Sequence, residues 1–296
     1  MKPIRKAVIP VGGLGTRFLP ATKVMPKEML PVVDKPLIQY AVEEARAAGI
    51  RQIILVTSRG KTMLEDHFDH AVELEAALRA RGKVEALRQL AEILPEEGEI
   101  SATRQPEARG LGHAVWCARE LVGDEPFAVI LPDDLVHGNT PCLKQMADVY
   151  AETGGNLVGV MDVPREHTDR YGILEPGATR DRLVEIRGLV EKPAPDKAPS
   201  TLSVIGRYIL QPEVFDHLSE KRTGAGGEIQ LTDAMAKLIG RQPFHGYRFA
   251  GTRYDCGDKL GFLMANLAFG LDRADLRPGL LEHIRKLAAD AELGTS

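Results

Sequence analysis

The stretch KAVIPVGGLGTR, residues 6–17, decides the fold class. Its first part, residues 6–10, is a compact apolar run that predicts a buried strand, and a glycine-rich turn follows at residues 12–17. Glycines at such a turn let backbone N–H groups point inward and hold phosphate oxygens. The stretch therefore predicts the first strand of an α/β protein, with a phosphate-binding loop at its carboxyl end.

Beyond this stretch, predicted strands and helices alternate as far as residue 163. The expected strands are short apolar or β-branched runs, and the expected helices carry an apolar face. Asp34 is well placed to cap the first helix. The βαβα order predicts a Rossmann-like, mostly parallel sheet with helices on both faces. The helices are expected at residues 36–48, 62–93 with a break near Gly82, 111–122 and 140–153, and the strands at residues 53–57, 100–104, 127–131 and 156–163.

The pattern of predicted elements changes after Val163. Residues 171–210 hold short strand-like pieces separated by glycine and proline, which predict a small antiparallel subregion attached to the main sheet. A strand is expected again at residues 245–249. Further helices are expected at residues 212–219, 228–239, 259–272 and 279–291.

The composition excludes several classes of protein. With 296 residues, 44% hydrophobic and 27% charged, the chain has the profile of a soluble globular protein and not of a disordered or collagen-like one. Lys and Arg number 38 against 42 Asp and Glu, so we expect no nucleic-acid partner. No apolar run approaches ~18 residues, so we expect no membrane partner. The three separated cysteines, Cys117, Cys142 and Cys256, predict reduced thiols and a cytoplasmic location.

Three nucleotide-binding motifs compete for the glycine-rich turn. A Walker loop requires a Lys-Ser/Thr pair after the glycines, and this chain lacks it. A dinucleotide-binding fingerprint requires a third glycine, and Phe18 stands in its place, which disfavours a nicotinamide-dependent dehydrogenase. The remaining interpretation is a nucleoside triphosphate loop to which Arg17 adds a positive charge.

Two further features support a triphosphate site. Lys23 and Lys27 lie between prolines just downstream of the loop, and a lysine is a compact, mobile charge that suits phosphate oxygens. Asp133 follows an apolar strand in the segment LPDD, at the edge where open parallel sheets bind ligands. Because Mg²⁺ commonly binds one or two carboxylates plus substrate phosphates, we expect Mg²⁺ as the cofactor at Asp133.

Taken together, the loop and the lysine read G-G-x-G-T-R…P-K, which resembles the signature of sugar nucleotidyltransferases. The segments KEMLP, GAGGEIQLTDA and YDCG are similar to the uridylyltransferases of that family, and similar segments run from residue 6 to about residue 263. The resemblance implies an enzyme that makes UDP-glucose and pyrophosphate from UTP and glucose 1-phosphate. In such enzymes the sugar phosphate attacks the α-phosphate of the nucleotide in line, and no covalent protein intermediate is needed.

The resemblance also implies roles for individual residues. Gln105 offers both a donor and an acceptor to a uracil edge, whereas His113, at the start of the next helix, could equally be a surface residue. Asp255 is implied as a second metal ligand beside Asp133. The catalytic residues are expected to be Arg17, Lys27 and Lys192, the nucleotide-binding residues Gly12, Gly13, Gly15, Thr16, Glu28, Gln105 and Gly110, and the sugar-binding residues Asp134, Gly172, Glu191 and Glu228.

We expect residues 1–296 to form a single nucleotidyltransferase domain. Residues 1–165 would bind mainly the nucleotide, residues 166–260 mainly the sugar, and residues 261–296 would form C-terminal helices. The resemblance further implies a homodimer or a homotetramer. Two alternatives remain open, a glucose-1-phosphate thymidylyltransferase and a catalytically silent relative that binds sugar nucleotides and regulates a partner.

Overall fold

Strand β1 covers Lys6–Pro10, as predicted, and lies inside the sheet between two parallel neighbours. Val8 pairs with Ile54 of β4 (Gln52–Thr57) on one side and with Val129 of β6 (Phe127–Ile130) on the other. Since these strands run in the same direction, the loops that leave their carboxyl ends gather at one edge of the sheet.

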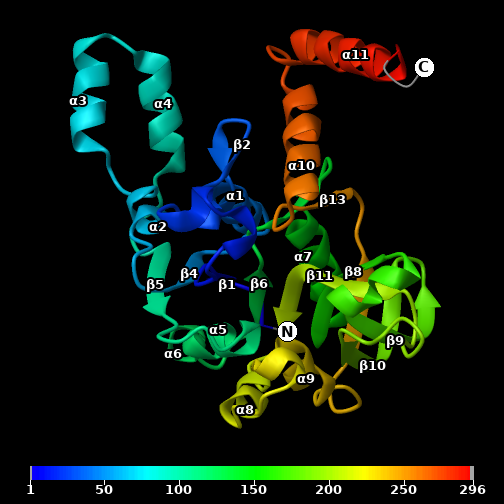
Figure 1. The fold of residues 1–296 in the computed structure, drawn as a ribbon. Coiled ribbons are helices and arrows are strands. Elements are labelled where there is room, and N and C mark those ends of the chain that lie inside the picture. Colours follow the sequence, from blue (N-terminus) through cyan, green and yellow to red (C-terminus); the bar gives the residue numbers. More distant parts are fainter. Residues whose placement is uncertain (1, 294–296) are drawn as a thin grey trace.

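Residues 2–293, which the computed structural model describes, form a nine-stranded sheet with helices on both faces (Figure 1). The strands from β5 to β6 are parallel, and the others form a mixed half. In spatial order the strands are β5 (Ile100–Arg104), β4, β1, β6, β11 (Leu202–Leu210), β8 (Asn156–Asp162), β12 (Phe244–Arg248), β10 (Leu183–Glu191) and β9 (Gly172–Arg180).

The antiparallel strands belong to the main sheet itself. Strand β11 pairs antiparallel with both β6 and β8, so it joins the two halves of the sheet at its centre. Every residue of β11 is buried, which fits its nearly continuous apolar sequence, because a strand covered on both faces needs no polar alternation. The α/β fold class is therefore correct, but the predicted subregion is continuous with the sheet.

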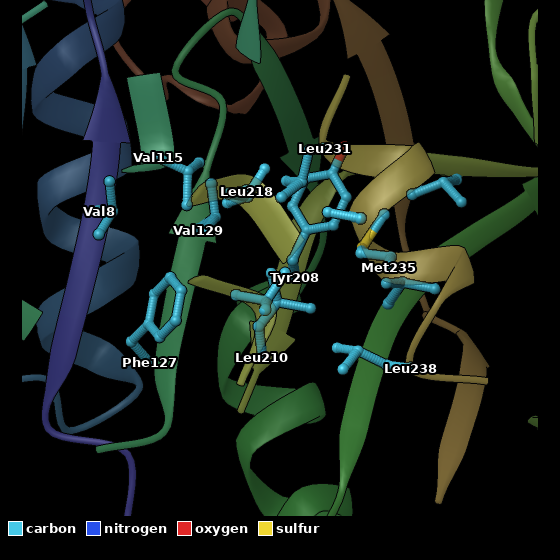
Figure 2. Packing of buried hydrophobic residues seen from close by; sticks show 14 of the residues in the cluster. Val8, Val115, Phe127, Val129, Tyr208, Leu210, Leu218, Leu231, Met235 and Leu238 are labelled. Carbon is cyan, nitrogen blue, oxygen red and sulfur yellow. The ribbon is translucent and has the colours of Figure 1, made fainter. Parts of the chain in front are cut away.

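Alternate residues of the strands supply two cores, one on each face. Val8 of β1 belongs to the core on the face covered by helices α5 (Leu111–Cys117), α8 (Val214–Ser219) and α9 (Leu231–Ala236), and Figure 2 shows it beside Val115 of α5. Ile9, its neighbour, faces helices α1 (Leu37–Ala47) and α7 (Cys142–Thr153) on the other side. Burial of apolar surface on both faces holds the strand ends, and therefore the loops that follow them, in fixed positions.

Asp34 does not cap helix α1, contrary to the sequence prediction. Pro36 occupies the position before the helix, while Asp34 accepts a hydrogen bond of 2.7 Å from Nη1 of Arg273. The reason is a small hairpin of strands β2 (Pro31–Val32) and β3 (Lys35–Pro36), whose turn carries Asp34 away from the helix. Two-residue strands of this kind leave no periodic signal in the sequence.

Other predicted elements differ at their ends. The segment 62–93 contains three helices, α2 (Met63–Asp66), α3 (Val72–Ala80) and α4 (Val84–Ile93), with the expected break at Gly82. The segment 111–122 divides into α5 and α6 (Arg119–Val122), and α9 begins at Leu231 rather than at Glu228. The short strands β7 (Asp134–His137) and β13 (Thr252–Asp255), which pair with each other, were not predicted.

Two helical pairs stand clear of the sheet in Figure 1. One is α3 with α4, and the other is α10 (Lys259–Asp272) with α11 (Arg277–Leu293). The Asp258 carboxylate caps α10 by accepting hydrogen bonds from the backbone N–H groups of Leu260 and Gly261. Within residues 2–293, no helix combines the length and the apolar character that crossing a membrane requires.

Candidate active site

Two adjoining cavities, of about 450 and 610 Å³, open where the carboxyl ends of β1 and β6 meet the mixed half of the sheet. Arg17, Leu131 and Asp133 line both of them, so the two cavities share a charged junction. Every site residue predicted from the sequence lines one cavity or the other. The first holds Gly12, Gly13, Gly15, Thr16, Lys27, Glu28, Gln105 and Gly110, the second holds Asp134, Gly172, Glu191, Lys192 and Asp255, and Arg17, Asp133 and Glu228 border both.

The glycine loop packs directly against the lysine segment. Gly15 has a φ of 66°, in the left-handed region that favours glycine. A Cβ atom at Gly15 would lie 3.2 Å from Cβ of Lys27 and 3.2 Å from Cβ of Thr22, so the two segments fit closely only because the side chain is absent. This contact brings the two halves of the G-G-x-G-T-R…P-K pattern to one wall of the first cavity.

Gln105 and Gly110 form another wall of the first cavity. The backbone N–H of Gln105 donates to the carbonyl of Thr57 at 2.9 Å, which extends the pairing of β4 with β5. Its side-chain Nε2 donates to the Gly110 carbonyl at 3.1 Å. His113 is buried beside them, with Nδ1 3.2 Å from the same Nε2, and is not a surface residue.

Gly110→Ala is expected to destabilise the protein and weaken nucleotide binding together. Gly110 has a φ of 99°, and a Cβ there would lie 2.7 Å from Cβ of Glu228 and 2.8 Å from the carbonyl oxygen of Ile229. Strain at such a position costs about 1–3 kcal/mol. Chemical denaturation should show this loss, and the KM for the nucleotide should rise. Gly123→Ala, also at positive φ but with no atom within 4 Å of the added Cβ, is the control and should leave the KM unchanged.

Behind the first cavity, Lys61 and Glu28 form a buried ion pair. Nζ of Lys61 lies 2.9 Å from Oε2 of Glu28 and also donates to the carbonyl of Val11. Burial raises the pKa of Glu28 and lowers the pKa of Lys61, and each partner's charge opposes the shift of the other. Among residues 2–293, nothing donates a hydrogen bond to Oε1 of Glu28. The carboxyl group is therefore oriented by Lys61 and keeps one oxygen for a ligand.

Lys61 was not predicted as part of the site. A single lysine in the polar segment SRGKT is typical of a solvated loop, and its partner Glu28 lies 33 positions earlier in the chain. Its contact with Glu28 forms only because the fold places β1 and β4 side by side. The local sequence around Lys61 does not predict that placement.

Charges of both signs converge at the junction of the cavities. Nζ of Lys27 lies 2.5 Å from Oδ2 of Asp133. Burial opposes ionisation of Asp133, but the charge and hydrogen bond of Lys27 outweigh it and lower the pKa of the carboxyl. Burial likewise opposes protonation of Lys27, yet Asp133 and Glu28 together raise the pKa of the amine. Both groups are therefore charged at neutral pH.

Carboxylate oxygens of Asp133 and Asp255 both lie close to Gly257. A Cβ atom on Gly257 would lie 2.8 Å from Oδ2 of Asp133, 3.0 Å from Oδ1 of Asp255 and 3.0 Å from Nη2 of Arg17. Burial raises the pKa of Asp255, and neighbouring carboxylates add to this effect. Across the described residues, no cluster of three or more His, Cys, Asp or Glu side chains forms a complete metal site. Two carboxylates fit Mg²⁺, which usually keeps several waters and binds substrate phosphates.

The second cavity is lined by Glu191, Lys192 and Gly172. Lys192 has a φ of 47°, a strained conformation for a residue with a side chain, and its backbone N–H donates to the carbonyl of Tyr171 at 2.9 Å. Nζ of Lys192 lies 3.5 Å from Oε1 of Glu191. Oε2 of Glu191 lies 3.3 Å from the position of a Cβ on Gly172, so a side chain there would crowd the carboxylate.

Asp134 lines the second cavity, and both of its carboxylate oxygens are paired within the protein. Oδ2 accepts a hydrogen bond of 2.7 Å from the backbone N–H of Gly206, and Oδ1 pairs with the Arg253 guanidinium. Arg253 also reaches the hydroxyl of Tyr171 at 3.2 Å and lines the second cavity. Asp134 therefore orients Arg253. The sequence pattern did not single out this residue, because an arginine just before YDCG is typical of a solvated side chain.

A fully buried arginine fixes the loop that carries Asp133. The guanidinium of Arg207, on β11, makes two hydrogen bonds of 2.8 Å to the Glu44 carboxylate. Its Nη1 donates to the carbonyl of Leu131 at 3.0 Å. A buried charge requires such complete pairing. The strand end leading to Asp133 is consequently anchored to helix α1.

The family model for nucleotidyl transferases matches residues 6–269, which include both cavities. The chain belongs to the nucleotidyl transferase family. The predicted resemblance is therefore confirmed. Within this family, the UTP–glucose-1-phosphate uridylyltransferase of Bacillus subtilis (strain 168) is 50% identical over 293 residues, 99% of this chain and 100% of that protein. The corresponding protein of Komagataeibacter xylinus is 56% identical over 260 residues, 88% of this chain and 92% of that protein.

Solved nucleotidyl transferase structures share the fold. The UTP-bound UGPase from Acinetobacter baumannii has a TM-score of 0.89 and 43% identity, and covers 96% of this chain and 99% of its own. A UDP-glucose pyrophosphorylase complexed with UDP-glucose has a TM-score of 0.81 and 44% identity, over 91% of this chain and 100% of its own. Both were solved with a uridine nucleotide bound.

Proposed function

We propose that the protein makes UDP-glucose and pyrophosphate from UTP and glucose 1-phosphate. The observation that carries the proposal is the pair of adjoining cavities with Arg17 and Asp133 at their junction and Lys27 paired with Asp133. One cavity suits a nucleotide and the other a sugar phosphate, and the charged groups lie where the two anionic substrates would meet. The uridylyltransferase relatives, at 50% and 56% identity, support the same substrates.

In the proposed reaction, a phosphate oxygen of glucose 1-phosphate attacks the α-phosphorus of UTP in line. The bond between the α-phosphorus and the bridging oxygen breaks, and pyrophosphate leaves with the electron pair. Since the attacking group is already an anion, the protein needs to orient the reactants and neutralise charge. We assign neutralisation of the pyrophosphate to Arg17 and Lys27, and binding of the sugar phosphate to Lys192. Glu191, Gly172 and Glu228 are assigned to the glucose.

The uracil is assigned to the wall formed by Gly12, Gly13, Glu28, Gln105 and Gly110, with Gly15 and Thr16 along the phosphates. A divalent cation, proposed to be Mg²⁺, would be held by Asp133 and Asp255. When bound, it would supply positive charge to the substrate phosphate oxygens. The first cavity draws mainly on residues before 134 and the second mainly on residues after them, which supports the proposed division of one domain into a nucleotide part and a sugar part.

A substrate matrix tests this function. Pyrophosphate release is measured with UTP, dTTP and CTP, each against glucose 1-phosphate and galactose 1-phosphate, with Mg²⁺ present and with a chelator. The expected result is the highest kcat/KM for UTP with glucose 1-phosphate, and loss of turnover on chelation. A higher kcat/KM with dTTP would favour the thymidylyltransferase, and no pyrophosphate release from any pair would favour the catalytically silent relative.

We also propose that the chain forms a homodimer or homotetramer through helix α10, and that it acts in the cytoplasm. Four large apolar side chains at helical spacing, all on α10, are 44–66% exposed: Leu260, Leu263, Met264 and Leu267. An exposed apolar stripe of this kind is typical of a surface that pairs with a second copy.

Leu263→Glu is expected to dissociate the assembly, because a carboxylate would be buried without a partner. Light scattering after gel filtration should give the 32.3 kDa of one chain, whereas the unaltered protein should give two or four times that mass. Leu74→Glu, at an exposed position on α3, is the control and should leave the mass unchanged. A monomeric mass for the unaltered protein would contradict the proposal.

A further inference from the structure

The orientation of the Gln105 amide is determined by its neighbours. Nε2 lies 3.1 Å from the carbonyl oxygen of Gly110, and a backbone carbonyl can only accept a hydrogen bond. The amide nitrogen, and not its oxygen, must therefore face Gly110. The same Nε2 lies 3.2 Å from Nδ1 of His113, so its second hydrogen is directed at the imidazole.

His113 must then accept with Nδ1, which requires the neutral ring with its proton on Nε2. Its surroundings favour this form. Burial lowers the pKa of His113, the charge of Arg109 lowers it further, and these effects outweigh the backbone of Glu107, which raises it. The ring is also fixed in place, because it is 5% exposed and stacks on Trp116 with 6.0 Å between ring centroids and 16° between planes.

With both amide hydrogens engaged, Oε1 of Gln105 is directed to the opposite side, at the wall of the first cavity. It lies 3.1 Å from the position of a Cβ on Gly12, which lines the same cavity. The hydrogen bonds that Gln105 makes within residues 2–293 all use its nitrogens, so Oε1 has no donor there. The wall of the cavity therefore offers an acceptor with an unused lone pair.

We infer that His113 is a positioning residue for base selection. By accepting a hydrogen bond from Nε2 of Gln105, it keeps the amide turned so that Oε1, and not the NH₂ group, faces the base. This inference rests on the proposed function, since it requires the base to lie in the first cavity. Uracil carries an N–H at ring position 3 and can donate to Oε1, whereas cytosine has a lone pair there that would face the lone pair of Oε1. A site that hydrogen-bonds a substrate N–H discriminates strongly against an analogue without it. Thymine carries the same N–H, so His113 selects against CTP and not against dTTP.

His113→Phe tests the inference through the ratio of kcat/KM for UTP to kcat/KM for CTP. Without the imidazole acceptor, the amide can turn, and this ratio is expected to fall about tenfold, the equivalent of one hydrogen bond. His113→Gln should restore the ratio to within about threefold, since its side-chain carbonyl can accept from Gln105. His70→Phe, at an exposed position outside both cavities, is the control for the change of residue type.

An unchanged ratio in His113→Phe, or an equal loss of kcat/KM for both nucleotides, would overturn the inference. A second measurement uses the unaltered protein and does not depend on turnover. The ¹⁵N chemical shifts of the His113 ring should show Nε2 protonated and Nδ1 unprotonated at neutral pH, and a proton on Nδ1 would overturn the inference even if His113→Phe did not fold. Failure of the unaltered protein to use UTP would contradict the proposed function, while the ring ¹⁵N shifts would still test the position of His113.

Discussion

Replacement of Lys27 by alanine should lower kcat by ~10²–10³, the usual cost of removing one preorganised stabiliser of transition-state charge. Lys27 lines the first cavity, where it pairs with Asp133 of the junction, and it remains charged because Asp133 and Glu28 raise the pKa of its amine. As pyrophosphate departs, its charge grows, and the ammonium stabilises that charge more than it stabilises bound UTP. The effect should therefore appear in kcat rather than in the KM for UTP. Steady-state pyrophosphate release measures both.

Lys23→Ala is the matched control for Lys27→Ala. Lys23 lies in the same proline-bounded segment but is exposed and outside both cavities. Its replacement should leave kcat within about twofold of the unaltered protein, as surface substitutions usually do. Near-normal kcat in Lys27→Ala would show that the pyrophosphate is neutralised elsewhere.

Lys192→Ala is expected to lower kcat by a similar ~10²–10³ and also to raise the KM for glucose 1-phosphate. The strained backbone at Lys192 places its ammonium beside Glu191 in the second cavity, where two anionic substrates must approach each other. Since the KM for UTP should change little, the pair of KM values separates a sugar-side role from a nucleotide-side role. Initial rates with each substrate varied in turn give both values.

Lys197→Ala is the control for Lys192→Ala, because Lys197 is exposed on the next turn of the chain and lies outside both cavities. The assignment of Lys192 would be wrong if its variant raised the KM for UTP alone, or if both variants had the same kcat.

Much of the fold follows from local sequence. Apolar residues in the run Lys6–Pro10 predict β1, and the glycines that follow predict a loop with left-handed backbone. Both predictions depend only on neighbouring residues. The position of β11 could not be predicted in the same way. Its apolar sequence indicates a buried strand, but its pairing with β6 and β8 depends on segments about 40–80 positions earlier in the chain.

The site shows the same division between local and distant information. Asp133 and Lys27 were predicted because a strand end or a glycine loop precedes each of them. Lys61 and Arg253 were missed because neither stands in a recognisable motif. Their roles come from ion pairs with distant residues, Lys61 with Glu28 and Arg253 with Asp134. Asp34 was wrongly predicted to cap helix α1, because the sequence does not indicate the β2–β3 hairpin. That hairpin directs Asp34 to Arg273 instead.

The most direct test of the central claim is a crystal structure of this protein with UDP-glucose and Mn²⁺, located by its anomalous signal in place of Mg²⁺. The account predicts the uracil beside Gln105 and Gly110, the glucose beside Glu191 and Lys192, and the metal on Asp133 and Asp255. A uridine nucleotide bound outside the two cavities, or a metal remote from Asp133, would contradict it.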